Sequence, residues 1–420
     1  MSGNRSIGTP RTARFVVGAI MVALPTFAVA AAEEPAWLQQ ARAREAKLVD
    51  AQPFASTDGV VTGRARAKLV NKVEPDEGTY YLEFDIGTDA PVSCEVLIDG
   101  FDVAQLLRNT AELSFESLAA ANGKIDTRHV ERIDAGVIGA NPYIAADWLY
   151  RAQTDKGPML GGFKHIALDM HSYGVYCAHV DLGFSETFRT VVRGFVESLQ
   201  IKGAAPPVPR YVEIQTMKLG DQPVGVARLT VTADDEGDLK SLLTTSLLAP
   251  AGQGVVLAQD STHLQWTTAE GELLNAAHVT VSNGELDLEV RLERGEDEQA
   301  HWHAVGTFKG KAVENDLGPD APATILTQVR ERRTLLGSAE PAGKETKDQM
   351  WVAIDPTRLI PTTFRIGAKD ASGRYTAIET SGPLEMESVM DAATGTATTS
   401  KVSMGPRTLL LERAYLQGSL

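Results

Sequence analysis

The sequence predicts an α+β domain, an antiparallel sheet with two helices, followed by an all-β antiparallel domain that forms a curved sheet or open barrel. Before residue 203 strand-like segments are mixed with two amphipathic helical segments, and after Arg210 almost every segment is strand-like. Between them, residues 203–209 read GAAPPVP, and these prolines predict an extended linker. The 420-residue chain also exceeds what one hydrophobic core usually supports. We therefore expect two domains, at 53–202 and 210–420.

Residues 1–30 have the pattern of a signal peptide. Arg5, Arg11 and Arg14 supply its positive region, residues 15–30 its apolar core, and Ala28-Val29-Ala30 its cleavage pattern. The apolar core is shorter than the ~20 residues that a membrane span needs, so a retained anchor is the lesser alternative. The segment predicts export to the periplasm or the cell exterior, and no integral membrane segment after cleavage.

The charge of the chain disfavours nucleic-acid binding. The formal net charge is −15, and it becomes −18 when residues 1–30, with three arginines and no acid, are removed. No cluster of basic residues offsets the repulsion between such a chain and phosphates. The acidity is better explained as a source of solubility.

The first domain begins after a polar lead-in at residues 31–52, which predicts a short helix or a disordered segment. Strand-like segments follow, and residues 102–121 have helical spacing with Asp102 as a possible N-cap. A second helix is predicted over 185–199, capped by Ser185. Its apolar residues form one stripe at the spacing of a buried helix face: Phe188, Val191, Val192, Phe195, Val196 and Leu199.

The second domain shows a series of hairpins. The clearest one turns at Asn283-Gly284, the residue pair that a type I′ turn prefers, and the strand after it alternates leucine or valine with charged residues. Another turn is predicted near Gly220-Asp221. Only residues 324–333 have helical character in this half.

Cys94 and Cys177 predict one disulfide bond. They are the two cysteines of a chain that the signal peptide sends to an oxidising compartment. Strand alternation puts each of them on an inward-facing side, which suits a buried bridge. In the chain-entropy account, such a long loop gives a stabilisation of about 4 kcal/mol.

Two functional hypotheses arise from Cys177 and the histidines: a catalytic cysteine–histidine pair and a metal site. Cys177 and His179 share a strand face and would form a thiolate–imidazolium pair, although no oxyanion hole or orienting group can be identified. His165, Asp169 and His171 share a face, as do His301 and His303, but each group supplies at most two imidazoles to a metal. We therefore expect no catalytic residue, metal site or cofactor, and solvent-facing histidines are the simpler explanation.

Familiar catalytic motifs are absent from the sequence: it has no G-x-S-x-G, H-E-x-x-H, P-loop or dinucleotide-binding glycine pattern. Four tryptophans could stack on sugars, but core positions are the more usual role for such residues: Trp148, Trp266, Trp302 and Trp351.

Residues 351–380 resemble a strand–turn–strand pattern of LolA-like periplasmic lipoprotein carriers, in which an Ile-Asp-Pro strand start precedes a Leu-x-Pro turn. The matching positions are Ile354, Asp355, Pro356, Leu359, Pro361 and Gly373. The segment from Gly183 to Leu199 is similar to the terminal strand and helix of PsbP-like domains, which act mostly as assembly or accessory modules. The resemblance of the second half to LolA-like carriers implies a concave apolar sheet face that holds an acyl chain or an apolar segment of a partner.

These observations predict an exported, two-domain binding or accessory protein without catalytic activity. It would bind an apolar small molecule, a lipid or a protein partner in the envelope. A hydrolase with a site between the domains is the competing hypothesis, with His165, His171 or His179 in that cleft. A structural scaffold of an envelope complex is the third.

Overall fold

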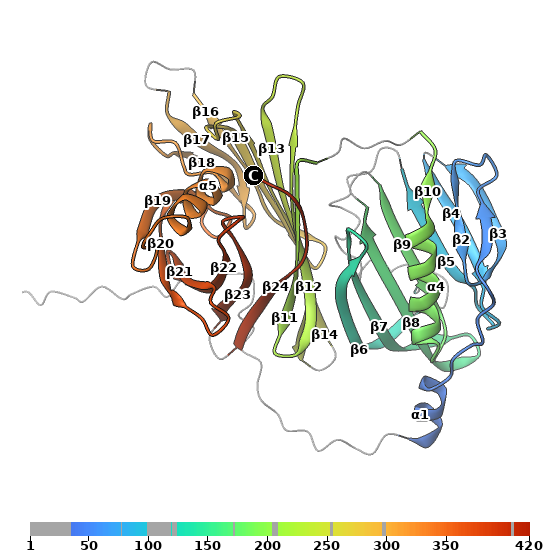
Figure 1. Cartoon of the computed structure of the whole chain (residues 1–420). Helices are drawn as coiled ribbons and strands as arrows, with labels where there is room; N and C mark the ends of the chain where they lie inside the picture. Colours follow the sequence, from blue (N-terminus) through green and yellow to red (C-terminus); the bar gives the residue numbers. More distant parts are fainter. Residues whose placement is uncertain are drawn as a thin grey trace, which may run out of the picture.

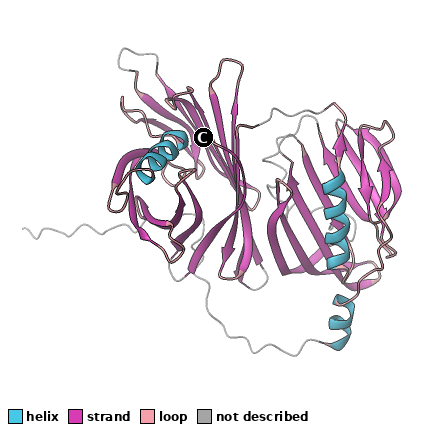
Figure 2. Ribbon diagram, in the orientation of Figure 1, coloured by secondary structure: helices cyan, strands magenta, loops and turns pink. Residues whose placement is uncertain are grey.

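The structure is a computed structural model that describes residues 35–76, 78–98, 119, 124–170, 173–203, 209–252, 255–295, 300–404 and 407–420. Most of these residues belong to antiparallel sheets (Figures 1 and 2). The helices among them are α1 (Ala36–Arg42), α4 (Ser185–Ser198) and α5 (Ile325–Leu336). In the described part of the chain, no helix combines the length and apolarity needed to cross a bilayer.

The first half of the chain forms two sheets around α4. The seven-stranded sheet has the order β3-β4-β5-β9-β8-β7-β6, and the small sheet has the order β1-β2-β10. Their strands are β1 (Gln52–Ala55), β2 (Val61–Ala65), β3 (Lys68–Asp76), β4 (Thr79–Asp85), β5 (Val92–Leu97), β6 (Lys124–Ile138), β7 (Asn141–Thr154), β8 (Gly157–Asp169), β9 (Gly174–His179) and β10 (Gln200–Ile201).

Helix α4 lies across one face of the seven-stranded sheet (Figure 1). Its predicted apolar stripe is buried from Phe188 to Val196, with Val191 and Val192 at 0% exposure. Leu199, the last predicted member, is the C-cap residue and is half-buried. Phe195 of this stripe packs between the two sheets: its ring centroid is 5.1 Å from that of Phe54 in β1 and 5.5 Å from that of Phe84 in β4. The helix therefore joins the two sheets into one core.

The start of α4 differs from the sequence prediction. Ser185 is the first helical residue, and the N-cap is Phe184, whose side chain makes no capping hydrogen bond. The carboxylate of Glu45 takes the capping role: it accepts the backbone N–H of Glu186 at 3.1 Å and that of Thr187 at 2.8 Å. Glu45, 141 residues away in the sequence, thus binds the backbone N–H groups of the first turn that a local serine would otherwise cap. The prediction of Ser185 as the cap is wrong.

Cys94 and Cys177 are directly opposite each other in the pairing of β5 with β9, and they form a disulfide bond. Both residues are buried beneath α4. The bond ties two neighbouring strands that are 83 residues apart in the sequence.

The second half forms one fourteen-stranded antiparallel sheet of order β18-β17-β16-β15-β14-β13-β12-β11-β24-β23-β22-β21-β20-β19. Its strands are β11 (Tyr211–Leu219), β12 (Gln222–Ala233), β13 (Leu239–Gly252), β14 (Val255–Thr267), β15 (Leu273–Ser282), β16 (Glu285–Arg294), β17 (Trp302–Phe308), β18 (Lys311–Asp316), β19 (Glu345–Trp351), β20 (Leu359–Lys369), β21 (Tyr375–Ser381), β22 (Leu384–Asp391), β23 (Thr396–Met404) and β24 (Arg407–Gly418).

This sheet is rolled but not closed. Its edge strands β18 and β19 do not pair with each other. Trp351, at the end of edge strand β19, nevertheless lies with its ring centroid 4.5 Å from that of His278 in β15. The roll therefore brings an edge of the sheet onto a strand far along its order (Figure 1). A curved, open sheet agrees with the sequence prediction.

Helix α5 packs on the inside of the roll and contacts strands that are far apart in the sheet. Leu326 packs with Tyr211 and Leu239, whereas Leu336, at the other end, packs with Phe364. Its start is fixed by a capping box of Thr324 and Thr327.

The two large sheets pack face to face through β6–β8 on one side and β12–β14 on the other. Ile144 and Trp148 of the first sheet share an apolar cluster with Val226 and Leu248 of the second. The guanidinium of Arg228 in the second sheet also forms a buried ion pair with the Asp169 carboxylate of the first sheet at 2.7 Å.

Both predicted turns are present. Asn283 and Gly284 have φ of 47° and 87°, the positive values that a type I′ turn requires, and they join β15 to β16. The turn at Gly220-Asp221 joins β11 to β12. The signal peptide at 1–30 and His171 lie outside the described residues, as do the helix at 102–121 except for residue 119 and most of the linker at 203–209.

Candidate functional site

The inner face of the rolled sheet is the candidate site. We define it by one row of directly paired residues that runs across five strands: Leu229, Leu243, His263, His278 and Val290. Trp351 packs against the histidines of this row, which shows that the row faces the inside of the roll.

Part of the inner face remains accessible although the sheet curls around it. Leu229, Leu243 and His263 are half-buried, whereas Val290 in the same row is fully buried. Towards the other end of the strands, four leucines are also half-buried beside a buried apolar cluster: Leu219, Leu257, Leu409 and Leu411. The inner face thus carries apolar side chains that still contact solvent.

His263 and His278 form a stacked pair, with ring centroids 3.9 Å apart and ring planes at 29°. Burial lowers the pKa of His278 to about 4, and a hydrogen bond with the Trp351 backbone opposes this shift. Burial, and next the neighbouring His278, lowers the pKa of His263 as well. Both rings are therefore neutral at physiological pH.

The chemistry available to this pair is hydrogen bonding. Among the described residues, Nε2 of each ring and Oγ of Ser241 are buried without a hydrogen-bond partner. A metal ion must lie in the plane of each imidazole that binds it, about 2.0–2.1 Å from the nitrogen, and stacked rings cannot both meet that condition. Among the described residues, no carboxylate is a cause of the pKa shift of either ring.

Helix α5 is held to the inner face by polar contacts at both ends. The backbone N–H of Ile325 donates to Oε1 of Gln265 at 2.9 Å. Arg332 forms an ion pair with Glu379 at 2.9 Å, and its guanidinium lies 4.6 Å from the Phe364 ring centroid. These contacts connect β14 with β20 and β21 and stabilise the roll.

Cys177 and His179, the pair that the sequence suggested for catalysis, do not form a thiolate–imidazolium pair. Cys177 is held in the disulfide, so it offers no thiolate beside His179. The Nδ1 atom of His179 lies 3.2 Å from the Pro91 carbonyl, and burial lowers the pKa of this histidine.

Three of the suggested metal ligands contact other side chains. Nε2 of His165 accepts the indole N–H of Trp148 at 3.1 Å, and burial lowers the pKa of His165 to about 4. Asp169 is paired with Arg228. Nδ1 of His301 lies 2.9 Å from the Asp316 carboxylate. In the part of the chain that the structure describes, no three histidine, cysteine or acidic residues form a group suited to a metal.

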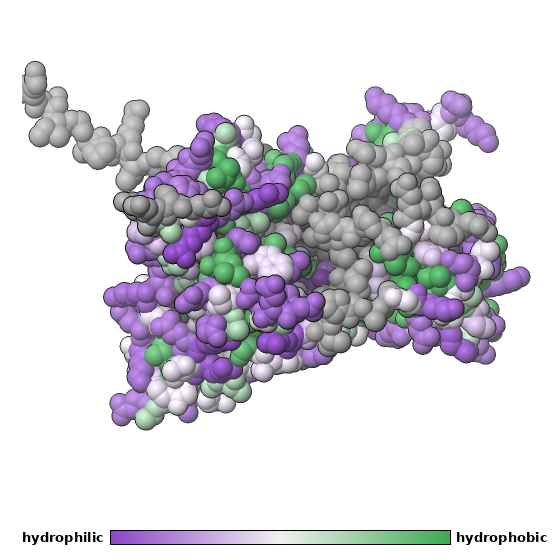
Figure 3. Space-filling model, turned by 90° about the horizontal axis from the view of Figure 1, so that it is seen from above, coloured by the Kyte–Doolittle hydropathy of each residue, from purple (hydrophilic) through white to green (hydrophobic). Residues whose placement is uncertain are grey.

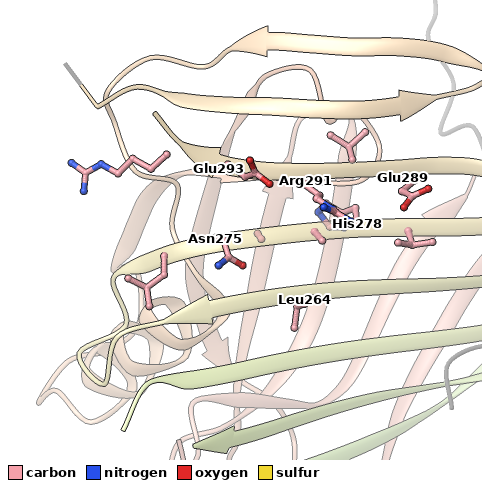
Figure 4. A pocket seen from close by; sticks show the side chains of 12 residues that line it. Leu264, Asn275, His278, Glu289, Arg291 and Glu293 are labelled. Atoms are coloured by element: carbon pink, nitrogen blue, oxygen red, sulfur yellow. The ribbon is translucent and has the colours of Figure 1, made fainter. Parts of the chain in front are cut away.

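The outer face of the same sheet carries an open pocket of about 640 Å³ over β15 and β16 (Figure 4). Alternation along the strands places Leu264 and Ala277 on this face, with the charged Glu289, Arg291 and Glu293 around them. Seen from above, apolar residues form separate patches among hydrophilic ones on the molecular surface (Figure 3). The outer pocket therefore combines apolar and charged side chains.

Sequence reasoning missed His263, His278 and Ser241. A usable signal was present in the hairpin pattern: pairing β14 with β15 around the Glu270-Gly271 turn places the two histidines opposite each other. Trp351 was expected in the core, and it is buried at 3% exposure, but its contact with the histidines required knowledge of the roll.

No family model and no curated protein matches this chain. Among solved structures, the beta-barrel-like protein of domain of unknown function DUF1849 from Brucella abortus is 14% identical, with a TM-score of 0.38. The similarity covers 51% of this chain and 99% of that one. The resemblances to LolA-like carriers and PsbP-like domains stay predictions, since no family match bears on them.

Proposed function

We propose that this chain is an exported binding or accessory protein that holds an apolar ligand on the inner face of its rolled sheet, without catalytic activity. The observation that carries the proposal is the set of half-buried leucines on that face, among them Leu229, Leu243 and Leu411. Burying apolar surface is worth roughly 25 cal/mol per Å², so covering this face with an acyl chain is favourable.

The openness of the sheet supports the same proposal. The edge strands β18 and β19 do not pair with each other, so a ligand can enter the roll between them without breaking a ladder hydrogen bond. Helix α5 and Trp351 already cover one part of the inner face. Leu229 packs beside Leu326 of the helix, and the leucines of the second group lie towards the other end of the strands. The ligand would extend the apolar core along the strands.

The competing hydrolase has less support from the interface between the sheets. That interface is occupied by an apolar cluster that includes Trp148 and Leu248. His165 lies on the same face of its sheet as Trp148 and is hydrogen-bonded to it, and Asp169 is paired with Arg228. These contacts favour a packed interface over a reactive cleft.

Native mass spectrometry of the protein purified gently from a bacterial envelope tests the proposal. The expected spectrum contains a species heavier than the bare chain by the mass of an apolar molecule, which organic extraction removes. A chain that is always empty and monomeric would overturn the proposal. A stoichiometric protein partner in place of a small molecule would favour the envelope scaffold instead.

A further inference from the structure

A second, smaller pocket lies far from the inner face, where β6–β8 meet the lead-in segment. Its volume is about 180 Å³, and its lining includes Arg42, Glu131, Arg132, Asp147, Lys164 and Asp181. The lead-in segment is fastened beside it, because the Arg44 guanidinium donates to the Leu182 carbonyl at 2.7 Å and the Arg44 carbonyl accepts the Phe184 N–H at 2.6 Å. The pocket is therefore built from three parts of the chain.

The loop after β9 approaches the sheet closely at Gly162. A Cβ atom at this position would lie 2.4 Å from the Asp181 carbonyl oxygen, so only glycine permits the approach. The same carbonyl oxygen accepts a hydrogen bond from Nζ of Lys164 at 2.5 Å. The close approach of the loop thus covers the lysine and orients its amine.

Arg42 and Arg132 in the pocket lining, and Arg44 and Arg189 nearby, each have a carboxylate partner. The ion pairs join Arg42 to Glu131, Arg44 to Asp181 at 3.1 Å, Arg132 to Glu186 at 2.7 Å, and Arg189 to Asp147 at 2.8 Å. These carboxylates therefore already have cationic partners.

Lys164 differs from these arginines. It is 3% exposed, and among the described residues its one hydrogen bond goes to the backbone carbonyl of Asp181. An ammonium group has three N–H donors, and burying a cation without an anionic partner is costly. Burial lowers the pKa of Lys164 to about 8, an effect that the charges of Asp147 and Asp181 oppose.

We propose that this pocket binds a small monocarboxylate, whose oxygens accept the two remaining N–H donors of Lys164. The volume is below the ~300–1,000 Å³ of pockets for drug-sized ligands, which limits the ligand to a few non-hydrogen atoms. Because Glu131, Asp147 and Asp181 are already paired with arginines, Lys164 supplies one uncompensated positive charge, and a singly charged carboxylate matches it better than phosphate. This site is independent of the apolar ligand on the inner face.

Thermal unfolding of the full chain in acetate, phosphate or chloride at constant ionic strength tests this inference. Acetate is expected to raise the Tm of the wild-type protein saturably, because a ligand bound by the native state stabilises it. Phosphate and chloride are expected to give no saturable rise. An equal response to all three salts in the wild type, or a saturable response to phosphate, would overturn the monocarboxylate site.

Two lysine variants assign the effect to the pocket. Lys164→Met removes the donors at similar volume, and Lys156→Met changes an exposed lysine of the β7–β8 turn. The acetate response is expected to be lost in Lys164→Met and retained in Lys156→Met. Retention of the full acetate response in Lys164→Met would contradict the inference. If that variant does not fold, the comparison of the three salts in the wild type tests whether a monocarboxylate binds.

Discussion

The imidazole of His263 stacks on that of His278 at 3.9 Å, beneath the indole of Trp351 from the far edge of the sheet. These three rings mark the point where the roll brings distant strands together. Their packing depends on both histidines being neutral, because protonation would place two like charges about 4 Å apart in a buried position.

The histidine pair therefore predicts a loss of stability in mild acid. The folded-state pKa of His278 is about 4, below the ordinary value of 6.5, so the unfolded chain binds the proton first as the pH falls. Stability is fully present above pH 6.5 and decreases towards pH 4, on the order of 3 kcal/mol for His278. Urea unfolding at pH 7.5 and pH 5 measures this difference.

Two variants test whether this loss of stability comes from the histidine pair. The double variant His263→Leu/His278→Leu is expected to lose less stability between the two pH values than the wild type. His129→Leu changes an exposed histidine and is expected to behave like the wild type. The account of the pair is wrong if all three proteins lose the same amount.

The disulfide makes a prediction about single and double substitutions. Cys94→Ser and Cys177→Ser are each expected to lower the free energy of unfolding by about 4 kcal/mol, because either one opens a loop of 83 residues. The double variant should be no less stable than either single variant, since one bond is lost in every case. Differential scanning calorimetry under non-reducing conditions measures the three losses, and additive losses would argue for separate roles of the two sulfurs.

The interface between the two large sheets depends on a buried ion pair. The side chains of Arg228 and Asp169 are 4% and 2% exposed, and their charged atoms are 2.7 Å apart. Asp169→Asn leaves the guanidinium without its counter-charge, so we expect a loss of about 3–5 kcal/mol.

Apolar replacement of both partners provides the control for this pair. Arg228→Met/Asp169→Leu is expected to be far less destabilised than Asp169→Asn, because no unpaired charge remains in the interface. Chemical denaturation measures both variants. A double variant as unstable as Asp169→Asn would show that packing, and not charge pairing, governs this contact.

Local patterns in the sequence were sufficient to predict several elements. The positive φ values of Asn283 and Gly284 follow from their residue types, and the stripe through Val191 and Phe195 follows from its spacing. The cysteine count indicated the disulfide, because no other partner was available in the chain.

The remaining features depend on contacts between distant residues. Glu45 caps α4 from 141 residues away, and a sequence pattern cannot show that this carboxylate outcompetes Ser185. The contact between Trp351 and His278 requires the curvature of the whole sheet, which accumulates over many strands. The Lys164 pocket likewise requires the lead-in segment to return to the sheet.

Binding of a fluorescent acyl-chain probe to delipidated protein tests the central claim most directly. Leu243→Asn places a polar group on the inner face, and Leu286→Asn makes the same change at a position that is 48% exposed on the β15–β16 hairpin. The account predicts saturable binding that Leu243→Asn weakens at least about tenfold, a loss of about 1.4 kcal/mol, and that Leu286→Asn leaves unchanged. Absence of saturable binding, or equal binding by both variants, would contradict it.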